Sequence, residues 1–272
     1  LDFHAMLLKL ESSQDIGFGY YTDSSDLQIT VDWPEEAVIE ITKKDGDTGK
    51  NLAGAVYGVY SDNACTKLIV KMPPTDSNGS SRVTLTKTQD TVYLKEITAP
   101  EGYVVQASSY GVKLVVGSTT KQTVTDKEQK GNLTVYKEGE VFVGAVSDEN
   151  GTSFQYEKRR QKGAVYNVYA AEDIVTAGGK TVYKKGAEVA KNLITGENGS
   201  VTVKNLPLGS YNVTEAQAPE NFYNAKETKK VTISYAGQTA EAAFSETTFT
   251  NDRQKAVVQV IKKDKDTENT LS

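Results

Sequence analysis

The sequence has very few of the residues from which cross-links and metal centres are usually built. Its 272 residues include one cysteine, Cys65, and one histidine, His4. A lone cysteine cannot form a disulfide within the chain, and these two side chains cannot supply a zinc site or a Ser-His-Asp triad. No cofactor-binding loop is recognisable either. We therefore expect no metal, no cofactor and no enzymatic turnover, and any covalent reinforcement must use other side chains.

The chain also lacks long apolar runs and an excess of positive charge. No run approaches the length that crosses a bilayer, and the first residues lack the basic-then-apolar layout of a secretion signal. The net charge of -5 gives no overall attraction for nucleic acid. Because the last segment, "VVQVIKKDKDTENTLS", begins a strand and a turn and then stops, we expect the chain to be a piece of a larger protein.

The composition that remains favours strands. Tyrosines outnumber phenylalanines by 15 to 7, threonine and valine are frequent, and helix-favouring runs are short. The hydrophobic content of 38% is enough to supply cores for two ordinary domains. These features predict an all-β protein.

Three landmarks recur along the chain and indicate an array of modules. The opening "VIEITKKDGDTGKNLAGAVYGVY" is matched by "NLTVYKEGE" with "QKGAVYNVYAAED", and again by "VVQVIKKDKDTENTLS". The segment "VYLKEITAPEGY" recurs as "YNVTEAQAPENFY", and "VTDKEQKG" recurs as "FTNDRQKA". The repeat predicts module one at 38–130, module two at 131–255, the start of a third module at 256–272, and the tail of a preceding β domain at 1–37.

Module two is longer than module one because it contains additional segments. The runs around "DENG" in "GEVFVGAVSDENGTSFQYEKRR" predict a hairpin with its turn at Asn150-Gly151, and "TAGGKTVYKKG" predicts a second hairpin. Loops added to a rigid scaffold are common places for binding specificity.

Strand alternation places polar groups at the ends of the apolar stripes. Each repeat contributes a lysine, each complete module adds a glutamate, and each complete module ends with an acid or an amide. In chain order these residues are Lys43, Glu96, Asp126, Lys137, Glu215, Asn251 and Lys262.

Such inward groups must pair, reach solvent or lose their charge, because burying an isolated charge is costly. One outcome is an ordinary, partly buried ion pair at the rim of a sandwich. The other is reactive: a neutral lysine amine is a nucleophile, and a protonated glutamic acid can relay protons. The product would be an amide, with ammonia released from Asn251 or water from Asp126.

The glutamate segments "LKEITAPEGY" and "VTEAQAPENF" and the openings "IEITKKD" and "VQVIKKD" resemble a known family. It is the collagen-adhesin B-type (CnaB) repeats, also called SpaA-like pilin modules, of Gram-positive surface proteins. The resemblance implies tandem transthyretin-like (prealbumin-like, Ig-like) β-sandwich modules in an elongated rod. It also implies an isopeptide bond between the first and last strand of each module.

Applied position by position, the resemblance implies which residues bond to each other. Lys43 would bond to Asp126 beside Glu96, and Lys137 to Asn251 beside Glu215. Lys262 would be the bond-forming lysine of the third module and remain a free amine here. Module two departs from the pattern at "YKEG" and "PENF".

The implied function is structural. A shaft or stalk of a surface adhesin or pilin would lie outside the cell, anchored to the wall through other parts of the parent protein, with neighbouring modules as its partners. The alternative is an adhesive module that contacts a host protein or glycan through the added hairpins.

Overall fold

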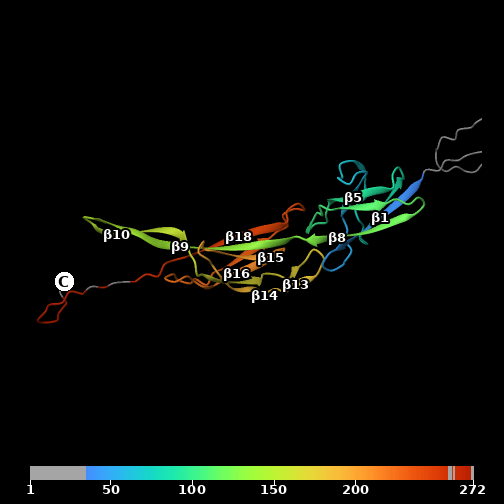
Figure 1. Cartoon of the computed structure of the whole chain (residues 1–272). Helices are drawn as coiled ribbons and strands as arrows, with labels where there is room; N and C mark the ends of the chain where they lie inside the picture. Colours follow the sequence, from blue (N-terminus) through green and yellow to red (C-terminus); the bar gives the residue numbers. More distant parts are fainter. Residues whose placement is uncertain (1–34, 257–258, 260, 271–272) are drawn as a thin grey trace, which may run out of the picture.

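The computed structural model describes residues 35–256, 259 and 261–270, and it confirms the predicted all-β class. Two β-sandwiches follow one another along an elongated molecule (Figure 1). The predicted tail of a preceding domain lies almost entirely outside the described residues. In the described ranges no helix is long and apolar enough to cross a membrane.

Module one consists of two four-stranded sheets, with strand orders β4-β1-β8-β6 and β3-β2-β5-β7. Its strands are β1 (Glu36–Asp45), β2 (Val56–Tyr60), β3 (Leu68–Lys71), β4 (Ser80–Thr86), β5 (Thr91–Thr98), β6 (Tyr103–Val104), β7 (Ser109–Lys113) and β8 (Thr119–Glu128). The first and last long strands, β1 and β8, run parallel, with Lys43 opposite Val124 and Asp45 opposite Asp126.

The side chains of β1 alternate between buried and more exposed positions along the strand. Every second side chain from Ala37 to Asp45 is buried, and Ile39 and Ile41 pack in the module-one core with Tyr57 of β2 and Leu94 of β5. The next inward position after Ile41 is Lys43. The strand that buries the apolar stripe therefore also carries the lysine amine between the sheets.

Module two repeats this plan with longer strands. One sheet contains β9 with β15 and β18 beside it, the other has the order β14-β11-β16-β17, and β12 and β13 form the small second hairpin that was predicted. The strands are β9 (Lys130–Asp148), β10 (Gly151–Arg160), β11 (Val165–Ala170), β12 (Ile174–Val175), β13 (Thr181–Tyr183), β14 (Glu188–Ile194), β15 (Ser200–Pro207), β16 (Gly209–Gln217), β17 (Thr228–Ile233) and β18 (Ala242–Asn251). Strands β9 and β18 are parallel, with Gly139 opposite Asn251.

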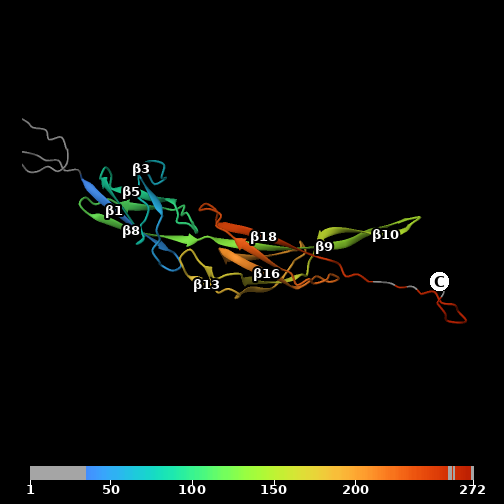
Figure 2. The same cartoon turned by 180° about the vertical axis from the view of Figure 1, so that it is seen from behind.

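Strand β9 continues beyond the sandwich and pairs with β10 to form a two-stranded ribbon that projects past the end of module two (Figure 2). This is the predicted hairpin, but its turn is one residue earlier than expected. Asp148 pairs with Gly151, so that Glu149 and Asn150 form the two-residue loop. The Asp148 carboxylate accepts a hydrogen bond from the Asn150 amide, and Gly151 takes the positive φ. The aspartate and the glycine thus set the turn from outside the loop.

A single residue, Gln129, separates the last strand of module one from the first strand of module two. Its side chain is buried and fully hydrogen-bonded to the 234–241 loop of module two. Nε2 donates to the carbonyls of Gly237 and Ala240, and Oε1 accepts from the amide of Ala236.

The same loop holds module one in return. Gln238 accepts a hydrogen bond from the Ala99 amide and donates one to the Ile97 carbonyl. Its own carbonyl accepts from Val105, and Tyr235 donates to the carbonyl of Tyr103. Because hydrogen bonds from both modules fix the junction, it is a braced connection and not a free linker.

Candidate functional site

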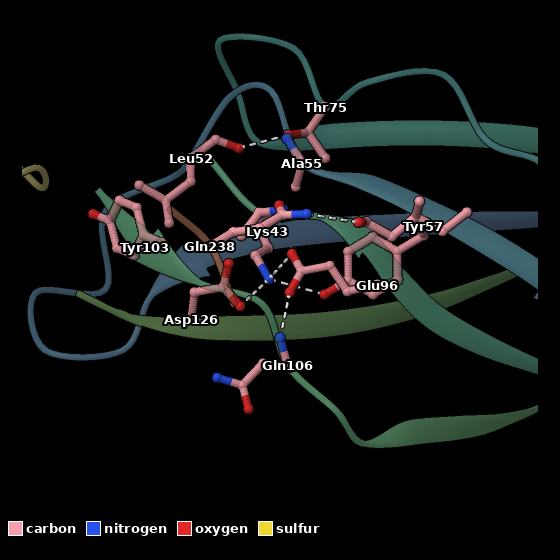
Figure 3. A network of polar contacts seen from close by, with 12 residues as sticks. Lys43, Leu52, Ala55, Tyr57, Thr75, Glu96, Tyr103, Gln106, Asp126 and Gln238 are labelled. Atoms are coloured by element: carbon pink, nitrogen blue, oxygen red, sulfur yellow. Dashed lines mark hydrogen bonds and ion pairs between the residues drawn. The ribbon is translucent and has the colours of Figure 1, made fainter. Parts of the chain in front are cut away.

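The polar cluster of module one lies between its two sheets. Lys43 comes from β1 and Asp126 from the parallel strand β8, and Glu96 reaches them from β5 of the opposite sheet (Figure 3). The Lys43 Nζ atom is 2.7 Å from Glu96 Oε1 and 2.5 Å from Asp126 Oδ1, and the three side chains are fully shielded from solvent. All three residues predicted for module one are therefore together.

Charge is unbalanced in this cluster, because one lysine faces two carboxyl groups. Burial raises the pKa of Asp126 to about 7; the Lys43 ammonium opposes this shift and the Glu96 carboxylate reinforces it. Glu96 is held in place by a hydrogen bond from the Gln106 backbone amide, 2.8 Å long. Near neutral pH a substantial share of Asp126 is thus the carboxylic acid, which a neutral amine attacks more readily than a carboxylate.

Module two brings its three predicted residues together in the same way. Lys137 lies on β9, Asn251 on the parallel strand β18, and Glu215 on β16 of the opposite sheet. Lys137 Nζ is 2.8 Å from Glu215 Oε1, and the Asn251 amide nitrogen donates to Glu215 Oε1 and Oε2 at 3.0 and 2.9 Å. Burial lowers the pKa of Lys137, with Glu215 opposing the shift, so burial favours the neutral, nucleophilic amine.

The two departures of module two from the family pattern compensate each other. In module one the buried Asp45 carboxylate accepts a hydrogen bond from the Tyr103 hydroxyl at 2.6 Å. In module two Gly139 takes the place of the aspartate and Phe222 the place of the tyrosine. The Phe222 ring lies so close to Gly139 that a Cβ there would clash with it. Donor and acceptor are lost together, so neither is left buried without a partner.

The segment predicted to open a third module contains a turn like that of module one. The Asp264 amide donates to the Asn269 carbonyl, as the Asp45 amide donates to Lys50 in module one, and the Asp264 carboxylate accepts from the amides of Asp266 and Thr267. Lys262 is exposed, and among the described residues it forms no ion pair. Its role in a third module stays a prediction.

Sequence reasoning missed one contact of the Lys43 amine. The hydroxyl of Tyr57 on β2 accepts a hydrogen bond from Lys43 Nζ at 2.9 Å. The available signal was the tyrosine shared by "GAVYGVY" and "GAVYNVY", which occupies the same place in both modules as Tyr57 and Tyr166. Because tyrosine is common in strands, this match is equally consistent with core packing.

Two consecutive sandwiches, each with its first and last strands parallel and a buried lysine between the sheets, define a tandem prealbumin-like protein. The family model described as "SpaA: Prealbumin-like fold domain" matches residues 37–129 and 150–248. The chain belongs to this SpaA family of prealbumin-like domains. The second match begins after the end of β9, yet the structure shows that β9 is the central strand of its sheet and carries Lys137.

The chain is similar to several solved structures, and the likeness to the first of these, the Bacillus anthracis TIE protein, supports the fold. That protein is 23% identical over 80% of this chain and 34% of its own, with a TM-score of 0.52. A streptococcal ancillary pilin is 21% identical over 82% of this chain and 63% of its own, with a TM-score of 0.33. The minor pilin GBS52 of Streptococcus agalactiae is 15% identical over 83% of this chain and all of its own, with a TM-score of 0.32. The chain thus spans about a third of the first protein and under two thirds of the second. No curated protein sequence matches significantly.

Proposed function

We propose that this chain is a load-bearing section of an extracellular shaft or stalk, of the pilin or surface-adhesin type, whose modules lock themselves with isopeptide bonds. The observation that carries the proposal is the same in both modules. A fully buried lysine forms an ion pair with a glutamate, and an acyl acceptor contacts the lysine in module one and the glutamate in module two. The lysine and the acceptor lie on the parallel first and last strands.

The bond chemistry balances without a cofactor. In module one the Lys43 ammonium first gives one proton to the Asp126 carboxylate. The neutral amine then attacks Cγ of Asp126, the Nζ–Cγ bond forms, a second proton passes from the nitrogen to the hydroxyl oxygen, and this oxygen leaves as water. In module two Lys137 attacks Cγ of Asn251 and the amide nitrogen leaves as ammonia. Glu96 and Glu215 carry protons from the lysine to the leaving group. Each site reacts once and alters only its own chain, so this is not turnover.

The position of each bond suits a structure under tension. A pulling force that enters at the start of β1 would pass through Lys43 to Asp126 and leave through the last residues of β8. Residues 44–125 would carry no load. The same path in module two runs from Lys130 to Lys137, across to Asn251, and leaves the β9–β10 ribbon unloaded. Closing loops of this length would also stabilise each module by on the order of 4 to 5 kcal/mol.

The direct test is the intact mass of the purified chain under denaturing conditions. We expect a deficit of one water and one ammonia relative to the sequence. Peptide mapping should then recover Lys43 joined to Asp126 and Lys137 joined to Asn251. A chain with the full sequence mass would overturn the proposed chemistry and leave two buried ion-paired clusters.

The ribbon supports a second function, which is compatible with the first: contact with a host protein or glycan. Phe142 and Phe154 are 58% and 63% exposed, and their rings pack edge to face, as do those of Phe142 and Tyr156. Arg253 covers the other part of this face, 3.6 Å from the centre of the Tyr156 ring. An exposed apolar face on a ribbon that is otherwise marginally stable is typical of an interaction site.

Replacing Phe142 and Phe154 together by serine should abolish binding of the ligand, because these rings form the exposed part of the aromatic face. The measurement is binding to a glycan array and to a panel of immobilised extracellular-matrix proteins. Leu68→Ser is the matched control, since Leu68 is a comparably exposed apolar residue in module one. Equal binding by the double variant and the control variant, or no ligand in either panel, would leave the shaft as the function of this chain.

A further inference from the structure

A tyrosine faces the glutamate of the cluster in each module. Tyr57 of β2 is the cross-strand partner of Glu96, and Tyr166 of β11 is the partner of Glu215. Both tyrosines are completely buried, although each carries a hydroxyl that needs a partner inside the protein. The aromatic body of the residue explains the packing, but a phenylalanine would fill a core position without bringing a hydroxyl to the lysine.

The hydroxyl of Tyr57 is one of two hydrogen-bond acceptors of the Lys43 amine. Lys43 Nζ donates to Asp126 Oδ1 at 2.5 Å and to the Tyr57 hydroxyl at 2.9 Å, and the Glu96 carboxylate lies 2.7 Å away as an ion-pair partner outside hydrogen-bond geometry. Figure 3 shows the amine among these three side chains. Acceptors therefore fix two of the N–H directions, and the one toward Asp126 is the direction in which the new bond has to form.

Tyr57 is not suited to act as a base. Burial, together with the carboxylates of Glu96 and Asp126, raises the pKa of its hydroxyl far above the usual value, so that it stays neutral. A neutral hydroxyl can accept a hydrogen bond from the amine without removing its proton. The Tyr57 hydroxyl can therefore hold one N–H group of Lys43 in a fixed direction without gaining or losing a charge itself.

We propose that Tyr57 is a positioning residue for isopeptide formation, holding one N–H of Lys43 so that the nitrogen lone pair is directed at Cγ of Asp126. The inference rests on the proposed bond. When the ammonium gives up the proton that points at Asp126, Tyr57 retains its N–H group, Glu96 stays beside the nitrogen as its ion-pair partner, and the lone pair takes the vacated direction toward the Asp126 carboxyl group. Attack forms the Nζ–Cγ bond, a second proton leaves the nitrogen by way of Glu96, and the Asp126 oxygen departs as water. A lone pair already aimed at its target removes an orientational cost from the reaction.

Module two supplies the comparison. Its tyrosine has the same place and burial, but within the described part of the chain the Tyr166 hydroxyl has no hydrogen-bond partner. Its ring packs against Phe249 with 4.9 Å between centroids, and the Lys137 amine is held by Glu215. Loss of the hydroxyl should therefore affect module one more than module two.

The experiment compares Tyr57→Phe and Tyr166→Phe with the unchanged chain. Each protein is made by cell-free synthesis with a short isotopic pulse and quenched in denaturant at intervals, and both crosslinked peptide pairs are quantified by mass spectrometry. We expect Tyr57→Phe to slow the Lys43–Asp126 bond by about tenfold or more, the effect of losing one hydrogen bond to a charged group. The Lys137–Asn251 bond in the same molecules should keep its rate. Tyr166→Phe should change the Lys137–Asn251 rate by less than about threefold.

Two readouts separate positioning from structure. Hydrogen exchange of the β1 and β8 amides reports whether module one of Tyr57→Phe is folded, and the slower reaction must persist in the folded molecules. The Lys137–Asn251 rate in the same molecules is the second readout, because a general loss of structure would slow that bond as well. An unchanged Lys43–Asp126 rate in Tyr57→Phe, or a slowing that hydrogen exchange accounts for by unfolding, would overturn the inference while leaving the bond proposal intact. Absence of the bond from the unchanged chain would instead overturn the bond proposal itself.

Discussion

Replacing Glu215 by glutamine should abolish the module-two bond and leave the sandwich folded. Glutamine keeps the size of the side chain and can still hydrogen-bond to Asn251, but it cannot take a proton from Lys137 or deliver one to the leaving nitrogen. The variant should therefore lack the ammonia deficit and retain the water deficit of module one. Without the covalent bond, module two should lose on the order of 4 to 5 kcal/mol of stability. The measurements are intact mass and denaturant unfolding.

The chain contains its own controls for this result. Glu96→Gln should produce the opposite pattern, keeping the ammonia deficit and losing that of water. Glu227→Gln is a control for charge, since Glu227 is exposed and its backbone carbonyl accepts a hydrogen bond from the Glu215 amide. A Glu215→Gln protein that still shows the ammonia deficit would mean that Glu215 is not the proton carrier.

Much of the candidate site could be predicted because strand alternation is a local property. Lys43 follows Ile39 and Ile41 at two-residue steps, so its inward direction can be read before any strand pairing is known. Lys137 follows its own apolar residues at the same two-residue steps, and this recurrence made an accidental pattern improbable. The glutamate and the acceptor followed by the same count, and the structure places all six residues in two clusters.

What escaped prediction depends on contacts between distant parts of the chain. The hydrogen bonds of Gln129 join residues more than 100 positions apart, and nothing in the local pattern distinguishes this glutamine from an exposed one. The same holds for Tyr57, whose partner is decided by the pairing of β2 with β5. The ribbon turn shifted by one residue because Asp148 caps it from outside, a side-chain effect that competes with the preference of Asn-Gly for the centre of a turn.

Pulling the chain from its two ends should produce no unfolding step in either module. In the locked protein, force crosses from β1 to β8 through the Lys43–Asp126 bond, and covalent bonds do not yield at forces that separate β-strands. In Asp126→Ala, the 83-residue stretch between Lys43 and position 126 should become free to extend, which gives an extension of roughly 290 Å. In Asn251→Ala, the longer stretch between Lys137 and position 251 should become free to extend, which gives an extension of roughly 400 Å. Single-molecule force spectroscopy measures both.

The two extensions differ enough to identify which module has opened, so each variant serves as the control for the other. The junction between the two modules also affects the expected extension. Gln129 and Gln238 tie the modules together through side-chain and backbone hydrogen bonds, and these can break without releasing any folded length. The locked protein should therefore stretch by little more than the straightening of its junction and of the segment after Asn251. Steps of about 290 and 400 Å in the unchanged chain would show that its modules carry load by strand pairing alone, and the proposed mechanical role of the two lysine clusters would be wrong.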